Sequence, residues 1–221
     1  RHAESVSNAE GRFAGWTDVP LTKAGVAEAR SAAASIAAAG ISFDVCYTSL
    51  LFRAIRTLWI VLEEMDRAWL PVVKSWRLNE RHYGALQGRS KADTVSQEGE
   101  SRVRGWHRGF NERPPALATD DPRHPRFDPR YATLHPDHIP SGESLADTGA
   151  RVVPFWQQVV VPALQEGQDA LVVAHGGSLR ALIRHVCEAC DGDLKDRSIP
   201  TGKPLLLELN GDMTVTAQRY L

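Results

Sequence analysis

A continuous apolar run that ends in a histidine and two glycines most constrains the fold of this chain. After its first residue, the run at residues 169–174 contains no polar side chain, as is typical of a parallel strand buried on both faces. His175 follows at once, and Gly176 and Gly177 would let backbone N–H groups at a helix start approach an anion. Buried parallel strands need helices on both faces, so the run predicts an α/β sheet with a ligand site at its carboxyl edge.

Helix and strand signals alternate through the first third of the chain. Residues 23–39 are rich in alanine and follow Thr22, a good N-cap, so they predict a helix. A short strand is expected at residues 43–47. The apolar period of residues 50–65 predicts a second helix, with Arg53 in its first turn.

The alternation resumes after a long irregular segment. Residues 107–142 are rich in proline, aspartate and arginine, and we expect a loop-rich insertion that is either a lid or a solvated connector. The remaining expected elements are helices at residues 143–165 and 178–190, and strands at 204–209 and 213–220 joined by a type I′ turn at Asn210-Gly211. Together they predict one α/β domain over residues 1–221, a three-layer sandwich with a mainly parallel central sheet flanked by helices.

Length and charge limit the kinds of partner. The 221 residues, 43% of them hydrophobic, suit a single domain with a full core. With 26 basic and 27 acidic residues the net charge is −1, so we expect neither nucleic acid nor membrane as a partner. No apolar run approaches the ~20 residues of a membrane span and no signal peptide is visible, which favours a cytoplasmic setting. Any cationic site must be local, built by arginines that the fold brings together.

The chain begins with Arg1-His2, a second histidine beside a cation. A histidine can carry a phosphoryl group when one ring nitrogen is free and cations offset the phosphate charge. The planar guanidinium of Arg53 suits phosphoryl oxygens. We expect a strand ahead of Arg1, so that His2, Arg53 and His175 meet at the carboxyl edge of one sheet. The histidines lack the spacing and carboxylates of a metal-ligand cluster, so no metal is expected.

Longer strings make the chain similar to one family. The most specific is RLNERHYGALQG at residues 77–88; others are RFAGWTD at 12–18, RAIRTLW at 53–59, DPRY at 128–131 and IPTG at 199–202. With Arg1-His2 and the AHG string at 174–176, they resemble the cofactor-dependent phosphoglycerate mutases of the histidine phosphatase superfamily. The resemblance covers essentially the whole chain. It implies interconversion of 3- and 2-phosphoglycerate in glycolysis and gluconeogenesis, by a homodimer or homotetramer.

The resemblance also implies roles for individual residues. His2 is implied to be phosphorylated by 2,3-bisphosphoglycerate as the primer, without a metal. Arg1, Arg53 and His175 are implied to hold the transferring phosphoryl, and Glu80 to serve as general acid and base. The implied substrate-binding residues are Asn8, Gly15, Tyr83, Lys91, His107, Arg108, Gly176 and Gly177.

Five positions near these residues depart from the family pattern: Ala3 replaces Gly, Ser7 replaces Trp, Ala14 replaces Ser or Thr, His107 replaces Arg and Gly177 replaces Asn. If position 3 requires a positive φ, Ala3 costs roughly 1 kcal/mol and shifts the loop of His2. His107 puts a titratable cation where the family has a fixed one. The groups for phosphohistidine chemistry are kept, while those that orient substrate are fewer.

Three functions therefore stay open. The first is the mutase. The second is a phosphatase of small phosphorylated metabolites, or a mutase with an altered substrate. The third is a binding relative without catalysis. Glu80 also has two interpretations, because its neighbours alone, without the longer string around them, favour a surface ion pair with Arg77 or Arg81.

Overall fold

Three parallel strands form the central sheet of the protein. The computed structural model describes residues 1–187 and 199–221. The strands, in the spatial order β2-β1-β3, are β1 (Val45–Thr48), β2 (Val72–Lys74) and β3 (Ala170–Val173). Cys46 of β1 lies opposite Val72 of β2 and Leu171 of β3, in parallel register. The apolar run before His175 is therefore a parallel strand, as predicted.

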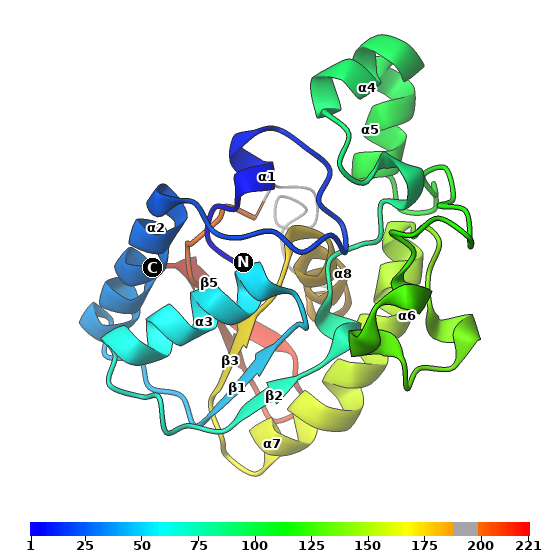
Figure 1. Cartoon of the computed structure of the whole chain (residues 1–221). Helices are drawn as coiled ribbons and strands as arrows, with labels where there is room; N and C mark the ends of the chain where they lie inside the picture. Colours follow the sequence, from blue (N-terminus) through cyan, green and yellow to red (C-terminus); the bar gives the residue numbers. More distant parts are fainter. Residues whose placement is uncertain (188–198) are drawn as a thin grey trace.

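Helices cover both faces of this sheet (Figure 1). The helices of the two layers are α2 (Lys23–Ala38) and α3 (Phe52–Glu64) on one face, and α6 (Leu145–Phe155) and α8 (Gly176–Val186) on the other. Side chains of β1 alternate between the faces: Cys46 packs in the cluster with α2 and α3, whereas Val45 and Tyr47 pack in the cluster with α6 and α8. The predicted α/β sandwich with a parallel central sheet is confirmed.

The predicted helices form with small shifts at their ends. Thr22 caps α2, and its hydroxyl oxygen accepts a hydrogen bond from the Gly25 N–H at 2.9 Å. The helix expected at residues 178–190 begins two residues earlier as α8. Residues 188–190 lie outside the described part of the chain.

The helix expected at residues 143–165 is continuous but not uniform. It consists of α6, a π-helical stretch at Trp156–Val160 and α7 (Val161–Gln165). Pro154 lies inside α6, two residues before the start of the π-helical stretch. Since proline has no N–H to donate, the wider π turn begins where the regular ladder of hydrogen bonds is already incomplete.

The hairpin near the C-terminus forms with a different turn from the one predicted. Its strands are β4 (Leu205–Leu209) and β5 (Val215–Tyr220), which pair antiparallel. A type I′ turn needs a positive φ at Gly211, but the positive φ, 66°, falls at Met213 instead. Asn210 and Asp212 accept hydrogen bonds from the Thr214 N–H at 2.9 and 3.0 Å. These side-chain bonds stabilise a longer loop than the two-residue turn.

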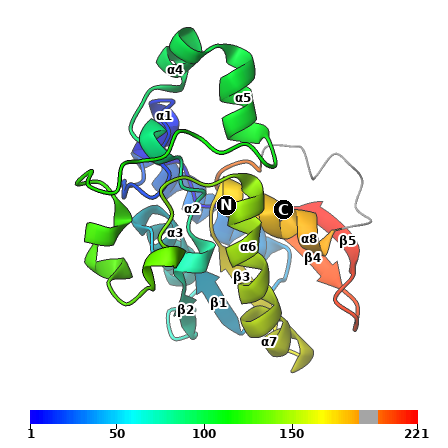
Figure 2. The ribbon, with the colours of Figure 1, turned by 90° about the vertical axis from the view of Figure 1, so that its right-hand side faces the viewer.

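The irregular segment begins after α5 rather than at residue 107. α4 (Lys91–Glu98) and α5 (Glu100–Arg108) project from the sandwich beside α6 and α8 (Figure 2). Between α5 and α6, the helical pieces are single 3-10 turns that each start with proline: Pro125–Phe127, Pro129–Tyr131 and Pro136–His138. A four-residue helix, α1 (Val6–Ala9), lies near the N-terminus. No helix in the described part of the chain is both long and apolar enough to cross a membrane.

Candidate active site

The two histidines singled out in the sequence lie next to each other at the carboxyl edge of the sheet. The backbone N–H of His2 donates to the carbonyl of Ala174, at the end of β3, over 2.9 Å. His175 follows Ala174 and is the N-cap of α8. The ring centroids of His2 and His175 are 5.0 Å apart, and both side chains are buried. The first segment of the chain therefore joins the sheet edge where the crevice of an α/β fold is expected.

The hydrogen bonds of His2 decide which ring nitrogen can react. Nδ1 lies 2.7 Å from the carbonyl oxygen of Ala3, which can only accept, so Nδ1 carries the proton. Nε2 then carries the lone pair, which accepts a hydrogen bond from the Nε–H of Arg53 at 3.4 Å. Burial, and then the charges of Arg53 and Arg1, hold the pKa of His2 well below its usual value. His2 is thus a neutral imidazole with an available nucleophilic nitrogen.

His175 is held from the opposite side by Ser49, which follows β1. The Ser49 hydroxyl accepts from the Leu51 N–H at 3.1 Å and lies 2.7 Å from Nε2 of His175, so the two side chains share a hydrogen bond. Nδ1 of His175 is buried without a hydrogen-bond partner among the described residues. Burial, and then Arg53, lower the pKa of His175. One ring nitrogen of His175 is therefore available to a ligand.

Arg53 is fixed beside His2 by backbone carbonyls rather than by carboxylates. Its Nη1 and Nη2 donate to Thr17 at 3.1 Å and to Gly15 at 2.8 Å, and its side chain is buried. Burial lowers the pKa of Arg53 to about 10, which leaves it charged at neutral pH. Gly15 has φ +55°, and a Cβ there would lie 2.0 Å from the side-chain oxygen of Gln87. Glycine at position 15 thus allows the turn that presents this carbonyl.

Arg1 is the second cation at His2. Its Nη1 donates to the Ile199 carbonyl at 2.8 Å, while its Nε is buried and has no partner in the described ranges. Neither Arg1 nor Arg53 forms an ion pair with a carboxylate of the described residues. Two guanidinium groups beside a nucleophilic imidazole, neither in an ion pair among the described residues, favour an anionic ligand there.

Glu80 points at the start of α8, not at the surface. Its side chain is 8% exposed, and Oε1 accepts hydrogen bonds from the backbone N–H groups of Arg81 and Gly177, each at 2.8 Å. The alternative interpretation, a surface ion pair with Arg77 or Arg81, is wrong, because the contact from Arg81 is its backbone N–H. A Cβ at Gly177 would lie 2.2 Å from Oε1, so only glycine leaves room for this contact.

A buried ion pair that the sequence interpretation missed holds the loop of Glu80. Arg151 of α6 pairs with Glu143 at 2.7 Å, and both side chains are 6% exposed. Arg151 also donates to the carbonyls of Asn79 at 2.9 Å and Glu80 at 2.8 Å, while Glu143 accepts from the His82 N–H at 2.8 Å. The pair therefore ties α6 to both sides of Glu80. A buried arginine and glutamate eight residues apart gave no local signal of this contact.

A small pocket of about 50 Å³ lies over His2 and collects most of the predicted site residues. Nine of them line it: Arg1, His2, Asn8, Gly15, Arg53, Glu80, Tyr83, Lys91 and His107. The lining residues that were not predicted as site residues are Ser5, Arg12, Phe13 and Ala14. The signal for Ser5 was its spacing from Asn8, since Ser5 caps α1 and donates from its hydroxyl to Asn8 Oδ1 at 2.8 Å.

The other four predicted residues lie around the small pocket but do not line it. Gly176 and Gly177 form the first turn of α8, and His175 lies directly before them. Arg108, the last residue of α5, lines an adjoining cavity of about 890 Å³ instead. Lys91 lines both spaces, and burial and then Arg1 lower its pKa. Arg108 is therefore placed farther from His2 than the family resemblance implied.

Two departures from the family pattern have different consequences from those expected. Ala3 has no positive φ, and its methyl group packs with Ala29 and Ile60, so the expected backbone strain is absent. The expectation that His107 supplies a titratable cation is also wrong near neutral pH. Burial, and then the charge of Lys91, lower the pKa of His107 to about 3, which makes it a neutral wall of the pocket.

The titratable groups of the site suit the transfer of a phosphoryl group. Within residues 1–187 and 199–221, no three His, Cys, Asp or Glu side chains are grouped as metal ligands. The buried, neutral His2 has cations on two sides and a carboxylate from a third element near it. Such an arrangement can accept a phosphoryl group and move a proton to or from a substrate oxygen.

Comparison with known proteins relates this site to one enzyme family. The profile of the histidine phosphatase superfamily (branch 1) matches residues 1–126 and 118–218. A 2,3-bisphosphoglycerate-dependent phosphoglycerate mutase of Nitratidesulfovibrio vulgaris (strain Hildenborough) is 52% identical over 221 residues, which are 100% of this chain and 88% of the relative.

Solved structures with the same fold include phosphatases and a mutase. A mycobacterial glucosyl-3-phosphoglycerate phosphatase in complex with VO3 has a TM-score of 0.72 at 21% identity, covering 100% of this chain and 94% of its own. An alpha-ribazole phosphatase from Shigella flexneri has a TM-score of 0.68 at 25% identity, covering 98% of this chain and 91% of its own. A phosphoglycerate mutase from Bacillus anthracis strain Sterne has a TM-score of 0.64 at 20% identity, covering 91% of this chain and 81% of its own. With its paired histidines, its cations and these matches, the chain belongs to the histidine phosphatase superfamily.

Proposed function

We propose that this enzyme interconverts 3-phosphoglycerate and 2-phosphoglycerate through a phosphohistidine at His2. The observation that carries the proposal is the geometry of His2, whose Nδ1 is bonded to a carbonyl while Nε2 faces a guanidinium. The 52% identity to a phosphoglycerate mutase supports the choice of substrate.

The proposed chemistry begins with attack by Nε2 of His2 on a phosphorus atom. A bond forms between Nε2 and phosphorus as the bond from phosphorus to the leaving oxygen breaks. Arg1, Arg53 and Nδ1 of His175, protonated in this proposal, surround His2 with donors for the equatorial phosphoryl oxygens. These groups are already fixed by carbonyls and by Ser49, so little reorganisation accompanies the transfer.

Glu80 is the proposed carrier of the proton. In the forward direction its carboxyl group protonates the leaving oxygen, and in the return step its carboxylate takes the proton from the attacking hydroxyl. Oε1 is held by two backbone N–H groups, and Oε2 makes no hydrogen bond within the described residues, so Oε2 is the proposed proton-transfer atom.

The residues present suit 2,3-bisphosphoglycerate as primer. Arg1 has a buried, unpartnered Nε, and Lys91 lines both the pocket over His2 and the cavity beside it, so two anionic groups of one ligand can be held by separate cations. The primer supplies the phosphoryl group that His2 carries. A cytoplasmic location stays a prediction from the sequence, and a homodimer or homotetramer stays a prediction from the family resemblance.

An assay of isomer formation tests the proposal. The enzyme is first dephosphorylated, and 2-phosphoglycerate is then measured from 3-phosphoglycerate with and without 2,3-bisphosphoglycerate. We expect turnover that depends on the bisphosphate and is lost in His2→Ala. Equal turnover without any bisphosphate would contradict a primed phosphohistidine.

A phosphatase remains the second candidate because the site opens broadly. The pocket over His2 shares Phe13, Lys91 and His107 with a cavity of about 890 Å³, and Ala14 contributes a methyl where the family pattern has a hydroxyl. Access of water to a phosphohistidine favours hydrolysis over transfer. The same assay separates the two, since a phosphatase releases inorganic phosphate from 3-phosphoglycerate without forming the isomer.

A further inference from the structure

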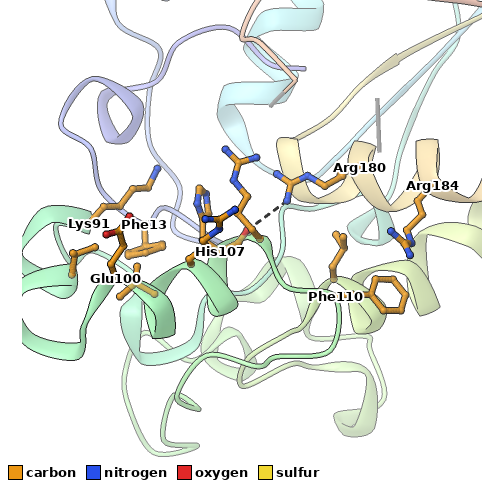
Figure 3. Close-up of a pocket in the computed structure, with 12 residues that line it drawn as sticks. Phe13, Lys91, Glu100, His107, Phe110, Arg180 and Arg184 are labelled. Atoms are coloured by element: carbon orange, nitrogen blue, oxygen red, sulfur yellow. Dashed lines mark hydrogen bonds between the residues drawn. The ribbon is translucent and has the colours of Figure 1, made fainter. Parts of the chain in front are cut away.

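The large cavity beside the catalytic pocket has a wall that the proposed mutase reaction does not use. Its near side consists of Phe13, Lys91 and His107, which also line the pocket over His2. Figure 3 shows that its far side is formed where Arg180 and Arg184 extend from α8 toward α5 and the residues that follow it. The cavity is therefore a continuation of the catalytic pocket, large enough for a ligand that extends beyond a three-carbon acid.

Three arginines lie on the part of this wall beyond the predicted substrate-binding residues. They are Arg104 of α5 and Arg180 and Arg184 of α8, called the distal arginines here. None of them forms an ion pair with a carboxylate in residues 1–187 or 199–221. Among the described residues that line the cavity, the one acidic side chain is Glu100. With Lys91 and Arg108 also present, the wall carries a large excess of positive charge in a chain whose net charge is −1.

Arg180 gives the clearest indication that an anion belongs there. Its side chain is 8% exposed, and its Nε is buried without a hydrogen-bond partner among the described residues. Its Nη1 reaches only the carbonyl of His107, at 3.5 Å, which is the dashed contact in Figure 3. Burial lowers the pKa of Arg180, as expected of a guanidinium taken from water without a counter-charge. An anionic ligand group would supply that counter-charge.

Arg184 lies at the outer end of the same wall, where an aromatic ring restrains it. Its guanidinium lies over the ring of Phe110, 4.6 Å from the ring centroid. Stacking on an aromatic ring restricts an arginine while leaving its N–H donors free at the edge. A buried, unpartnered arginine and a stacked arginine one helical turn apart on α8 therefore line the cavity together.

We propose that the distal arginines form a second anion subsite. The ligand class is a phosphomonoester that carries a further carboxylate or phosphate several carbons from the phosphoryl group that meets His2. The inference rests on the proposed function only in assigning the small pocket to the transferred phosphoryl.

The test compares two linear ligands that differ only at the distal end. 6-Phosphogluconate ends in a carboxylate, and sorbitol 6-phosphate ends in a neutral hydroxymethyl group. Isothermal titration calorimetry gives the dissociation constant of each with the wild type, Arg104→Gln, Arg184→Gln and Arg180→Lys. Arg30→Gln removes an equal charge from exposed α2 and is the control for net charge. Circular dichroism checks the fold of each variant.

We expect 6-phosphogluconate to bind the wild type and Arg30→Gln at least about tenfold more tightly than sorbitol 6-phosphate. The ratio of the dissociation constants of the two ligands falls toward one in Arg184→Gln and Arg104→Gln, while the dissociation constant of sorbitol 6-phosphate changes little. Equal binding of the two ligands by the wild type would overturn the subsite. A preference that survives in both variants but is lost in Arg108→Gln would also overturn it, because the carboxylate would then lie at the near wall.

The same preparations are assayed for mutase turnover, which separates the two proposals. Turnover from 3-phosphoglycerate without a preference for 6-phosphogluconate rejects the distal subsite alone. A preference for 6-phosphogluconate without any isomer formation rejects the proposed mutase function and leaves the subsite supported.

Discussion

The position of the Glu80 carboxylate depends on the absence of a side chain at Gly177. The two residues are 97 positions apart in the chain, and they meet because α8 starts where the loop of Glu80 passes the sheet edge. By its resemblance the family has Asn at position 177, whereas glycine in this chain leaves room for Oε1 of Glu80 beside the N-terminus of α8. Helix N-termini present free N–H groups, so the contact holds Oε1 of Glu80 at a defined place.

A Cβ at position 177 tests this contact. Gly177→Ala places a carbon 2.2 Å from the present position of Oε1, and the flexible Glu80 side chain is the part that moves. We expect mutase turnover to fall at least tenfold, since correctly placed acid–base groups contribute about 10²- to 10⁴-fold. The dissociation constant for 3-phosphoglycerate changes little. Gly149→Ala in α6, where the nearest atom is 3.9 Å from a Cβ, is the control. Unchanged turnover in Gly177→Ala would mean that Glu80 acts from another position.

The type and the sequence position of a residue were enough to predict some members of the site but not others. Arg53 and His175 were predictable because each stands at the start of a helix that follows a strand, and sheet geometry brings such positions together. His2 was predicted from its place beside Arg1 and from the strand expected ahead of it. The role of Arg151 could not be predicted. Its partners lie on two separate segments, residues 76–80 and Glu143, and nothing in its local pattern distinguishes it from a surface arginine.

At the scale of elements, helix α6 holds the loop that carries Glu80 in place. Arg151 leaves the middle of α6 and donates to the carbonyls of Arg77, Asn79 and Glu80, while Glu143 precedes the helix and receives the His82 N–H. Val152 and Phe155 of this helix are buried against the sheet. One helix therefore contributes both to the core and to the placement of the proposed proton carrier.

Breaking this ion pair tests the support that α6 provides. Arg151→Met leaves the Glu143 carboxylate buried without its partner, and we expect the free energy of unfolding to fall by about 3–5 kcal/mol. Arg113→Met breaks an exposed pair with Asp147 and costs at most about 1 kcal/mol. Urea denaturation measures both. Equal losses in the two variants would show that the buried pair adds no particular support.

Element types were more predictable than the connections between them. The helices and strands follow apolar periods and caps such as Thr22, which are local signals. The predicted type of hairpin turn was wrong because the side chains of Asn210 and Asp212 both accept from the Thr214 N–H. The Asn-Gly pair alone gives no sign of these side-chain bonds. The irregular residues between α5 and α6 give no periodic signal, so their contribution to the site could not be placed in advance.

At the scale of the whole molecule, the fold buries several neutral histidines. Burial lowers the pKa of His82 and of His107 to about 3, and also lowers the pKa of His2 and His175. An unfolded histidine takes up a proton near pH 6.5. Between about pH 3 and 6.5 the unfolded chain therefore binds more protons than the folded one, and stability falls as the pH falls.

Denaturation at two pH values measures this linkage. We expect the free energy of unfolding to be lower at pH 5 than at pH 7.5, by up to about 2 kcal/mol for each buried histidine. The aspartates of lowered pKa contribute at more acidic values, because their ordinary pKa is 3.8. His82→Gln reduces the difference, and His135→Gln at an exposed position does not. A free energy of unfolding that is constant from pH 7.5 to 5 would contradict the burial of neutral histidines.

The central claim is that His2 carries the phosphoryl group, and intact mass measurement under alkaline conditions tests it most directly. The protein is incubated with 2,3-bisphosphoglycerate and then digested, and the phosphorylated residue is located. The geometry of Nε2 predicts one acid-labile phosphoryl group on His2, which is absent from His2→Ala. A phosphoryl group on another residue, or an enzyme that forms 2-phosphoglycerate while His2 stays unmodified, would contradict it.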